Sequence, residues 1–289
     1  MSPLPRPLTV VCHDAGAANL IGAWLPQLAD SRTRLVLTGP ARMTSAAQSP
    51  GTRMDDLEQA LNGAACVLSG SGWASDLEHA ARVGARARGI RSVAVLDHWV
   101  NYPERFVRAG VRQMPDEIWV TDEDALRIAT AAFPDVPVAL QPNTYLEETV
   151  SRVALVPPHG DLLVLMEPAR SNWGRSQPGE FQALDYLLEN LSGIGLPPGT
   201  RMRLRPHPSD PPGKYNDWCR ASGRVVIDDH DGLEGALSPA RWVAGCETAA
   251  LVVAMAAGRE VISILPPWAP RCRLPQRQIR HLQHMVHAP

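Results

Sequence analysis

The sequence predicts an α/β fold made of two successive domains, each built on an open, mostly parallel sheet. Short runs rich in β-branched residues alternate with alanine- and leucine-rich stretches, which is the pattern that βα units produce. The alternation stops and restarts around SRVALVPPHGD (151–161), where Pro157, Pro158 and Gly160 indicate a linker. We therefore expect an N-terminal domain at 1–152 and a C-terminal domain at 153–289.

In the first half, each expected strand is a short apolar run bounded by polar or turn-forming residues. These strands are Leu8–Cys12, Arg34–Thr38, Cys66–Ser69, Ser92–Leu96, Glu117–Val120 and a weaker Val138–Gln141. The stretches between them have helical composition, at Ala17–Ala29, Met54–Leu61, Ser75–Arg88 and Glu123–Ala132.

The second half repeats this order of elements. Strands are expected in LLVLMEP (162–168), RMRLRPHP (201–208), RVVIDD (224–229), RWVAG (241–245) and EVISILPP (260–267). Helices are expected in FQALDYLLENL (181–191), LEGAL (233–237) and TAALVVAMAAG (248–258).

The composition excludes several classes of protein. A net charge of −2 gives no basic field for nucleic acid or an anionic membrane, so neither is expected as a partner. Five widely spaced cysteines without a CxxC pair favour neither a disulfide framework nor a structural zinc site. No signal peptide and no transmembrane run is apparent, which predicts a cytoplasmic protein. The sequence does not predict an oligomeric state.

Polar residues follow the expected strands repeatedly, and they do so in both halves. Ligands of open parallel sheets bind outside the carboxyl ends of the strands, so these positions are the candidate site. Because such residues converge on one edge of each sheet, we expect a ligand cleft between the two domains. The candidates are His13, Asp14, Gly16, Ser71, Asp97, Glu167, His207, Glu247 and Thr248.

The stretch RPHPSD (205–210) holds His207 between two prolines, which restrict the backbone to extended values. An imidazole fixed in this way can donate to phosphate oxygens, and Arg205 or Ser209 can add further donors. The alternative is a loop histidine between turn-forming prolines.

The stretch AGCETAALVVAMAAG (244–258) places Glu247 and Thr248 at the start of an expected helix. The unpaired N–H groups and positive dipole end of a helix N-terminus favour a phosphate, and Thr248 adds a hydroxyl. The Glu247 carboxylate is suited to accept hydrogen bonds from the two hydroxyl groups of a ribose. The alternative is an ordinary N-cap on a buried helix.

The stretch HDAGAANL follows the first strand, and here His13 is the candidate general base because its ordinary pKa lies near working pH. Asp14 or Asp97 would orient it, while Gly16 permits close approach of a substrate to the backbone. The alternative is a turn with an aspartate N-cap. The spacing does not match a dinucleotide fingerprint, so NAD is not expected.

Two further loops are candidates for binding the acceptor or the sugar. DHWVNYPERF (97–106) is dense in aromatic and polar residues, among them His98, Trp99 and Asn101; its alternative role is packing between domains. GSGWASD (70–76) contains Ser71, and it fits a plain strand-to-helix turn equally well. Glu167 follows a strand of the second half and is assigned to the same group.

The acidic clusters TDED (121–124) and DDHD (228–231) raise the question of a metal. The first precedes a helical run and is explained by capping. The second lies at a strand end, but aspartate-rich turns are common. We therefore predict no metal and no cofactor, with the nucleotide-sugar as substrate. No Walker A motif and no nucleophile elbow occur.

The HP pair at 207–208 and the Thr248-led helix about 40 residues later, within two Rossmann-like halves, resemble the GT-B glycosyltransferases. The pair is most similar to the bacterial sialyltransferase and Kdo-transferase group, which uses CMP-activated sugars without a metal. In that group the HP histidine and a later hydroxyl lie near the donor phosphate, which the resemblance carries to His207 and Thr248. HDAGAAN, DHWVNYPERF and LMEPAR also resemble uncharacterised proteins of bacterial surface-polysaccharide loci.

The resemblance implies an acceptor domain at 1–152, a donor domain at 153–289 and a metal-independent, inverting transfer of a sugar to a hydroxyl acceptor. Bacterial glycan or natural-product biosynthesis is the implied setting. Two alternatives remain open: a non-hydrolysing UDP-sugar 2-epimerase, which shares the layout, and a non-catalytic GT-B protein that only binds a nucleotide.

Overall fold

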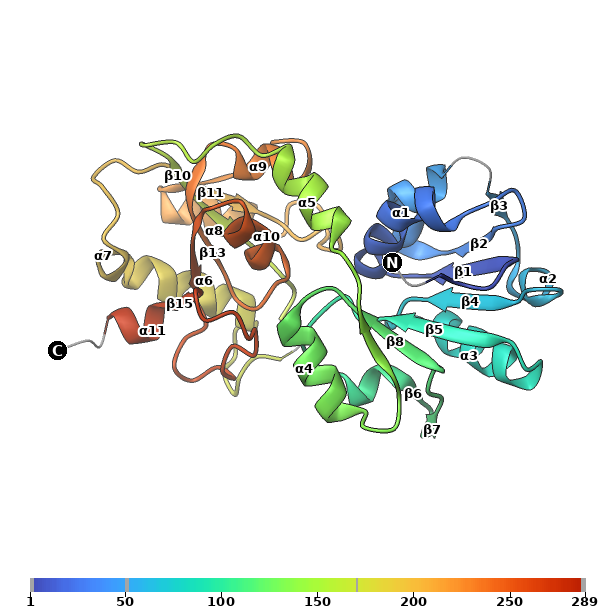
Figure 1. The fold of residues 1–289 in the computed structure, drawn as a ribbon. Coiled ribbons are helices and arrows are strands. Elements are labelled where there is room, and N and C mark those ends of the chain that lie inside the picture. The colour runs from blue at the N-terminus through green and yellow to red at the C-terminus, as the bar shows by residue number, and fades with distance from the viewer. Residues whose placement is uncertain (1–2, 50–51, 170, 287–289) are drawn as a thin grey trace. The chain divides into compact units, whose positions relative to one another are not determined.

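The computed structural model describes residues 3–49, 52–169 and 171–286. The chain divides into two compact units, Met1–Tyr145 and Leu146–Pro289, here called unit 1 and unit 2. The division falls inside helix α5 (Thr144–Ser151), whereas the predicted boundary lies just after that helix. Figure 1 shows the elements of each unit.

Unit 1 is built on a seven-stranded sheet with the order β3-β2-β1-β4-β5-β8-β9. Every neighbouring pair in this sheet is parallel. Its strands are β1 (Leu8–Cys12), β2 (Arg34–Leu37), β3 (Arg53–Met54), β4 (Cys66–Ser69), β5 (Arg91–Val95), β8 (Glu117–Val120) and β9 (Val138–Leu140).

Helices pack on both faces of this sheet because successive strand residues point to opposite sides. Leu8, Val10 and Cys12 of β1 pack in one apolar cluster with α1 (Ala15–Leu28). Val11 lies in a second cluster with residues of α2 (Leu57–Leu61) and α3 (Leu77–Ala87). Burial on both faces explains why the strands read as continuous apolar runs rather than as alternating ones.

A third cluster lies on the same face as Val11, toward the β8–β9 end of the sheet, where α4 (Glu123–Ala132) packs against residues of β5 and β8. The short helix η3 (Pro103–Phe106) joins it and leads into an antiparallel ribbon of β6 (Val107–Arg108) and β7 (Val111–Arg112). Two further short helices, η1 (Gly39–Met43) and η2 (Ser45–Gln48), lie against α1.

Unit 2 is built on a six-stranded parallel sheet with the order β12-β11-β10-β13-β14-β15. Its strands are β10 (Asp161–Leu165), β11 (Met202–Arg205), β12 (Val225–Ile227), β13 (Ala240–Gly245), β14 (Glu260–Ser263) and β15 (Arg280–His281). Its helices are α6 (Gly179–Glu189), α7 (Leu191–Ile194), α8 (Asn216–Ser222), α9 (Gly232–Leu237), α10 (Ala250–Ala256) and α11 (Leu282–Met285).

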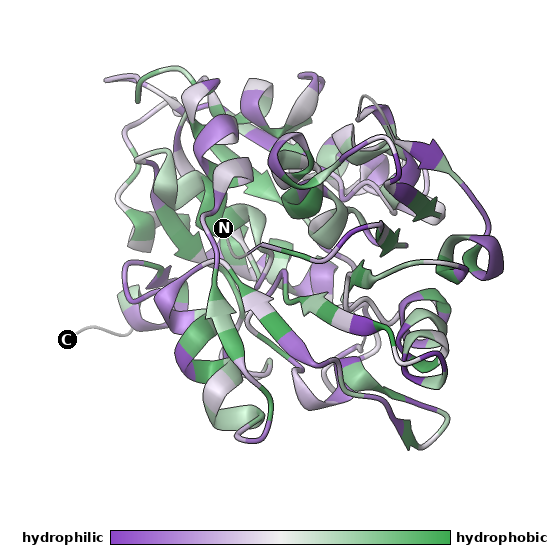
Figure 2. Cartoon of the chain, turned by 45° about the vertical axis from the view of Figure 1, so that its right-hand side comes forward, coloured by the Kyte–Doolittle hydropathy of each residue, from purple (hydrophilic) through white to green (hydrophobic). Residues whose placement is uncertain are grey.

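The hydropathy of the chain follows this arrangement. In Figure 2 the strands of both sheets are largely green, whereas the helices carry green and purple residues side by side. The large apolar cluster of unit 2 combines Leu162, Val164 and Met166 with residues of α6, α8 and α11.

The predicted class, α/β with two Rossmann-like units, is confirmed, and three strands of unit 1 have the predicted bounds: β1, β4 and β8. The helix expected at Met54–Leu61 begins only at Leu57, because Arg53 and Met54 pair with β2 as a strand. The ribbon β6–β7 and strand β15 were not predicted, since each of these strands has only two residues.

Candidate active site

The order of the strands identifies one position at which each sheet favours a ligand. In both units the chain order reverses beside the first strand, which places the switch point between β1 and β4 in unit 1 and between β10 and β13 in unit 2. Ligands bind outside the carboxyl ends of the strands at such a point. His13 follows β1 and Glu167 follows β10, so predicted residues lie at both switch points.

The His13 ring is held at the carboxyl edge of unit 1 by neighbouring strand ends. Its Nδ1 lies 3.0 Å from Thr38 Oγ1, just after β2, and its backbone N–H donates to Glu78 Oε1 at 2.7 Å. Its Nε2 lies 4.0 Å from Asp14 Oδ1, which is beyond hydrogen-bond distance. His13 Nε2 and the Asp14 carboxylate are therefore close enough for both to contact one hydroxyl group.

Asp14 and Asp97 have different electrostatic surroundings. Asp97 Oδ1 forms an ion pair with Arg105 Nη1 at 2.9 Å, and both side chains are largely buried. Burial and the charge of Asp97 raise the pKa of Asp14, outweighing the opposing contributions of His13, Arg105 and Arg108. Carboxylates in such unequal surroundings suit different roles, with Asp97 as a fixed anion and Asp14 as the group that exchanges a proton. We call His13, Asp14, Asp97 and Arg105 the acid–base cluster.

Glycines form part of the wall around the acid–base cluster. At three positions a methyl group in place of the glycine hydrogen would overlap a side chain of the cluster. The pairs are Gly16 with Asp97, Gly72 with Asp14 and Gly39 with His13. The prediction that Gly16 permits close approach to the backbone thus corresponds, in the structure, to close approach by Asp97.

Replacing Gly16 by alanine is expected to leave the fold intact and to reduce turnover about 100-fold. Alanine is favoured over glycine inside a helix, so α1 tolerates it, but its methyl group displaces Asp97 from Arg105. Circular dichroism and turnover measure the two effects. Gly235→Ala is the matched control, since a methyl group there meets nothing nearer than 3.4 Å; equal turnover in both variants would contradict the role of Asp97.

Glu78 lies beneath the cluster as a fully buried carboxyl group. Its Oε1 accepts the His13 N–H, while its Oε2 has no hydrogen-bond partner in the described residues. Burial, with a further contribution from Asp14, raises the pKa of Glu78 above its ordinary value of 4.5. Ionising Glu78 therefore opposes folding, and the stability that this group supplies below pH 4.5 is lost as the pH rises through the raised pKa.

Glu78→Gln is accordingly expected to raise the Tm at pH 7 and to leave it nearly unchanged at pH 4. Glutamine keeps the oxygen that accepts the His13 N–H but carries no charge. Thermal unfolding at both pH values tests this, with the exposed Glu148→Gln as control. A lower Tm at pH 7 would mean that the folded protein needs the charge.

The other predicted residues of unit 1 lie around the acid–base cluster or pack against α4. Ser71 is fully buried; its hydroxyl donates to Val95 O at 2.9 Å and lies 3.3 Å from Arg105 Nη1, so it supports Arg105. Trp99 donates from Nε1 to Asp122 Oδ2 at 2.8 Å, and its N–H bonds to His98 Nδ1 at 2.9 Å. Asn101 adopts a φ of 58°, a left-handed conformation that asparagine tolerates.

In unit 2 the structure fixes the orientation and the tautomer of His207. The Ser209 N–H donates to His207 Nδ1 at 3.1 Å, so Nδ1 is an acceptor and the neutral ring carries its proton on Nε2. Burial lowers the pKa of His207, against the opposing charge of Asp210, which favours that neutral form. His207 Nε2–H is thus a hydrogen-bond donor at the carboxyl end of β11, and Ser209 positions the ring.

Thr248 and Glu247 follow β13. The helix expected at 248–258 begins at Ala250 and ends at Ala256, and Thr248 Oγ1 accepts from Ala250 N at 3.3 Å. Glu247 Oε1 forms an ion pair with Arg273 Nη2 at 2.6 Å, which a ribose would have to share or displace.

His207 and Thr248 follow strands that flank β10, so two strand spacings, about 10 Å, separate their strands. A phosphate group with a hydrogen bond on either side needs about 8 Å between donor atoms. Glu167, at the end of the intervening strand β10, accepts the Glu247 N–H. The strand order therefore places His207 and Thr248 on either side of the end of β10.

Arg205 differs from the other predicted donor-site residues. Its Nη1 pairs with Asp228 Oδ2 at 2.7 Å and donates to His230 O at 2.8 Å, so these contacts direct it toward β12. Asp228 also pairs with the fully buried Arg203. The DDHD cluster is therefore part of an arginine–aspartate network. No group of three or more potential metal-ligating side chains occurs within the described residues.

Thr38, Glu78, Arg105 and Arg273 contact predicted site residues but were not themselves predicted. Thr38 follows β2 and meets the strand-end criterion that selected the others. Arg105 lies in the quoted loop 97–106 but was assigned no role. Glu78 is in the first turn of α3 and Arg273 in an irregular segment, where the pattern of strands carries no signal.

The fold is that of a two-unit α/β protein with a Rossmann-like parallel sheet in each unit. No protein family and no curated protein sequence matches the chain. The S. aureus MnaA–UDP structure is similar with a TM-score of 0.60 and 12% identity, over 89% of this chain and 78% of that one. The Neisseria meningitidis UDP-GlcNAc 2-epimerase bound to UDP-GlcNAc has a TM-score of 0.57 and 10% identity, over 89% and 82%.

The glycosyltransferase of kitacinnamycin is similar over a larger share of both chains, 98% of this chain and 90% of that one, with a TM-score of 0.54 and 13% identity. At these identities the likeness establishes the fold alone. The similar structures include a glycosyltransferase and a 2-epimerase, the two kinds of enzyme that the sequence suggested. The resemblance to the HP-motif group stays a prediction. Within the described ranges, no helix combines the length and apolar character needed to span a bilayer.

Proposed function

We propose that the chain is an enzyme that transfers a sugar from a nucleotide-activated donor to a hydroxyl acceptor without a metal. The observation that carries this proposal is the acid–base cluster. Asp14, whose pKa is raised, lies beside His13 Nε2, while the ion pair with Arg105 holds Asp97 in place. Such a set can accept a proton from a hydroxyl group near neutral pH.

In this mechanism the acceptor hydroxyl passes its proton to His13 Nε2 or to Asp14 as its oxygen bonds to the anomeric carbon. The bond from that carbon to the donor phosphate breaks, and the phosphate leaves with the electron pair. The charge that develops on the phosphate is stabilised by His207 Nε2–H and the Thr248 hydroxyl. Arg205, which pairs with Asp228, is a weaker candidate for this role than the sequence suggested.

The donor is expected to be a CMP-sugar, as the resemblance to the HP group implies, with UDP-sugars as the principal competitors. Thermal unfolding with CMP, UDP, GDP and CDP tests whether the donor site binds a nucleotide and which nucleobase it prefers. A nucleotide at 100 times its Kd stabilises the folded chain by about 2.7 kcal/mol. His207→Ala is expected to remove most of this stabilisation, whereas His159→Ala, in the segment before β10, is the control.

The result for each nucleotide has a defined meaning. A CMP-selective response supports the HP-group donor site, whereas a UDP-selective response contradicts the CMP prediction but keeps a nucleotide-sugar enzyme. No stabilisation by any of the four nucleotides would contradict the donor site as a whole.

A UDP-sugar 2-epimerase is the second candidate, because a cluster with several proton-exchanging groups also suits inversion at C2 of one sugar ring, and two of the similar structures are 2-epimerases or bind UDP. Incubation with UDP-GlcNAc in D₂O and without an acceptor separates the two. Inversion breaks the C2–H bond, so an epimerase incorporates deuterium with no acceptor present, and a transferase does not. A chain that binds a nucleotide but turns over in neither assay would be the non-catalytic alternative.

A further inference from the structure

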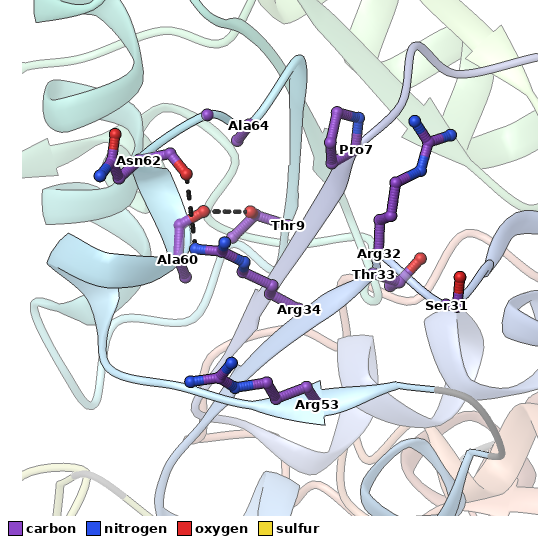
Figure 3. Close-up of a pocket in the computed structure, with 11 residues that line it drawn as sticks. Pro7, Thr9, Ser31, Arg32, Thr33, Arg34, Arg53, Ala60, Asn62 and Ala64 are labelled. Atoms are coloured by element: carbon purple, nitrogen blue, oxygen red, sulfur yellow. Dashed lines mark hydrogen bonds between the residues drawn. The ribbon is translucent and has the colours of Figure 1, made fainter.

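A pocket of about 380 Å³ opens at the amino-terminal edge of the unit 1 sheet, away from the acid–base cluster. Pro7 and Thr9 contribute to it from the start of β1, whereas His13 follows the end of that strand. Thr9 and His13 are four residue steps apart along the extended chain, roughly 13 Å. Figure 3 shows the pocket with the arginines Arg32, Arg34 and Arg53 around it.

The charge of the pocket is one-sided. Its lining contains three arginines, with Thr9, Ser31, Thr33 and Asn62 as polar residues and no carboxylate. Outside the lining, Asp30 Oδ2 pairs with Arg32 Nη2 at 2.9 Å. Arg34 is the Cα partner of Arg53 on β3 and of Thr9 on β1, so the three form a row across adjacent strands. Like charges directly opposite each other on neighbouring strands repel and destabilise the sheet.

The existing contacts leave donor groups available in this row. The contacts of Arg34 run through Nη1, to Gln59 O, to Asn62 O at 3.4 Å and to Asp55 Oδ2 at 3.7 Å. Within residues 3–49, 52–169 and 171–286, no hydrogen bond or ion pair engages the Arg34 Nη2 or the Arg53 guanidinium. Arg34 is thus fixed through one nitrogen while the rest of its planar fork remains able to donate.

We propose that this pocket binds the phosphate or diphosphate group of a phosphorylated ligand, as a site separate from the proposed donor site. Guanidinium groups match phosphate oxygens through paired N–H donors, and an anion between Arg34 and Arg53 removes their repulsion. The volume lies within the range of small-molecule sites, so the pocket has room for more than a bare phosphate.

Titration of the full chain with inorganic pyrophosphate, followed by backbone amide NMR, tests the site directly. The Gly63 and Ala64 amides, which line the pocket, are expected to shift. In Arg32→Gln/Arg53→Gln the affinity should fall at least about tenfold, since both substitutions remove charged hydrogen-bond donors to the phosphate oxygens. Arg112→Gln/Arg127→Gln is the control, as both of these residues are exposed in the same unit.

A second measurement on the ligand-free chain is specific to the repulsive pair. Arg53→Gln is expected to raise the Tm without ligand while it weakens pyrophosphate binding, because it removes one of two facing charges. If Arg53 had a purely structural role, Arg53→Gln would lower the Tm of the ligand-free chain. A lower Tm together with unchanged binding would overturn the proposal.

Two further experiments distinguish this pocket from the donor site and identify the kind of molecule that supplies the phosphate group. His207→Ala/Thr248→Ala should keep the shifts at Gly63 and Ala64, and loss of these shifts in that variant, or their persistence in the arginine variant, would overturn the proposal. Sedimentation with phosphatidate vesicles, lost in the arginine variant, would assign the phosphate to a lipid headgroup. Binding of pyrophosphate without vesicle binding would assign it to a soluble ester.

Discussion

Replacing Asp228 by alanine is expected to destabilise unit 2 by about 3–5 kcal/mol, because it removes a carboxylate partner from the fully buried guanidinium of Arg203. The Asp228 side chain is fully buried, as is that of Arg203, to which it is paired. Arg205 Nη1 and His230 Nδ1 lie 2.7 and 2.8 Å from its two oxygens. Arg203 would retain Asp161 at 2.7 Å, the Ala236 carbonyl at 2.8 Å and a contact with His230 Nδ1 at 3.4 Å.

The same network predicts how stability depends on pH. Burial by itself would raise the pKa of Asp228, but hydrogen bonds from Arg205 and His230 and the charge of Arg203 outweigh it and lower the pKa below the ordinary 3.8. The unfolded chain thus binds the proton first, so the stabilisation is present above about pH 4 and is lost as the pH falls below that value.

Urea unfolding at pH 7 and at pH 3 measures both effects. The difference between wild type and Asp228→Ala should shrink at the lower pH, because the Asp228 carboxyl group of the unfolded chain is then largely protonated. Asp217→Ala, which removes an almost fully exposed partner of Arg220, is the control and should change stability by less than about 1 kcal/mol. Equal effects of the two substitutions would contradict the importance of the buried network.

Replacing Asp14 by asparagine is expected to reduce turnover about 10²- to 10⁴-fold while the chain still binds nucleotide. Asparagine keeps the shape of the side chain and cannot accept the proton. In the wild type, turnover should rise with pH through the raised pKa of Asp14, since below it the group is protonated and cannot act as a base. The variant should lack this rise.

Turnover with the nucleotide sugar identified by the thermal screen provides the measurement, over a range of pH. Asp135→Asn, at an exposed position of unit 1, is the control. If Asp14→Asn retained turnover within about threefold of wild type with the same pH profile, the proton would have to pass to His13 alone. His13→Gln would then show the larger loss.

The fold was predictable from local pattern because strands buried on both faces give continuous apolar runs. β1, β4 and β8 are such runs, and their bounds follow from the polar residues at each end. β15 and the ribbon β6–β7 were not predictable, since pairing of two residues is decided by tertiary neighbours.

The candidate site was predictable only as far as strand ends indicate it. His13, Asp14 and Asp97 come from two strand ends, and the parallel sheet brings them to one edge. Arg105 reaches Asp97 from the short helix η3, and Glu78 reaches the His13 N–H from α3. Contacts of this kind depend on how helices pack on the sheet, which the spacing of residues along the chain does not encode.

The glycines beside the acid–base cluster also constrain how the sequence can diverge. At Gly16 and Gly72 the backbone lies outside the left-handed region, so it is free volume, not backbone conformation, that excludes a larger residue. A saturation library at these two positions should therefore yield folded proteins of graded activity, ordered by side-chain size. At Gly39, where φ is 50°, the same library should lose folded protein as well.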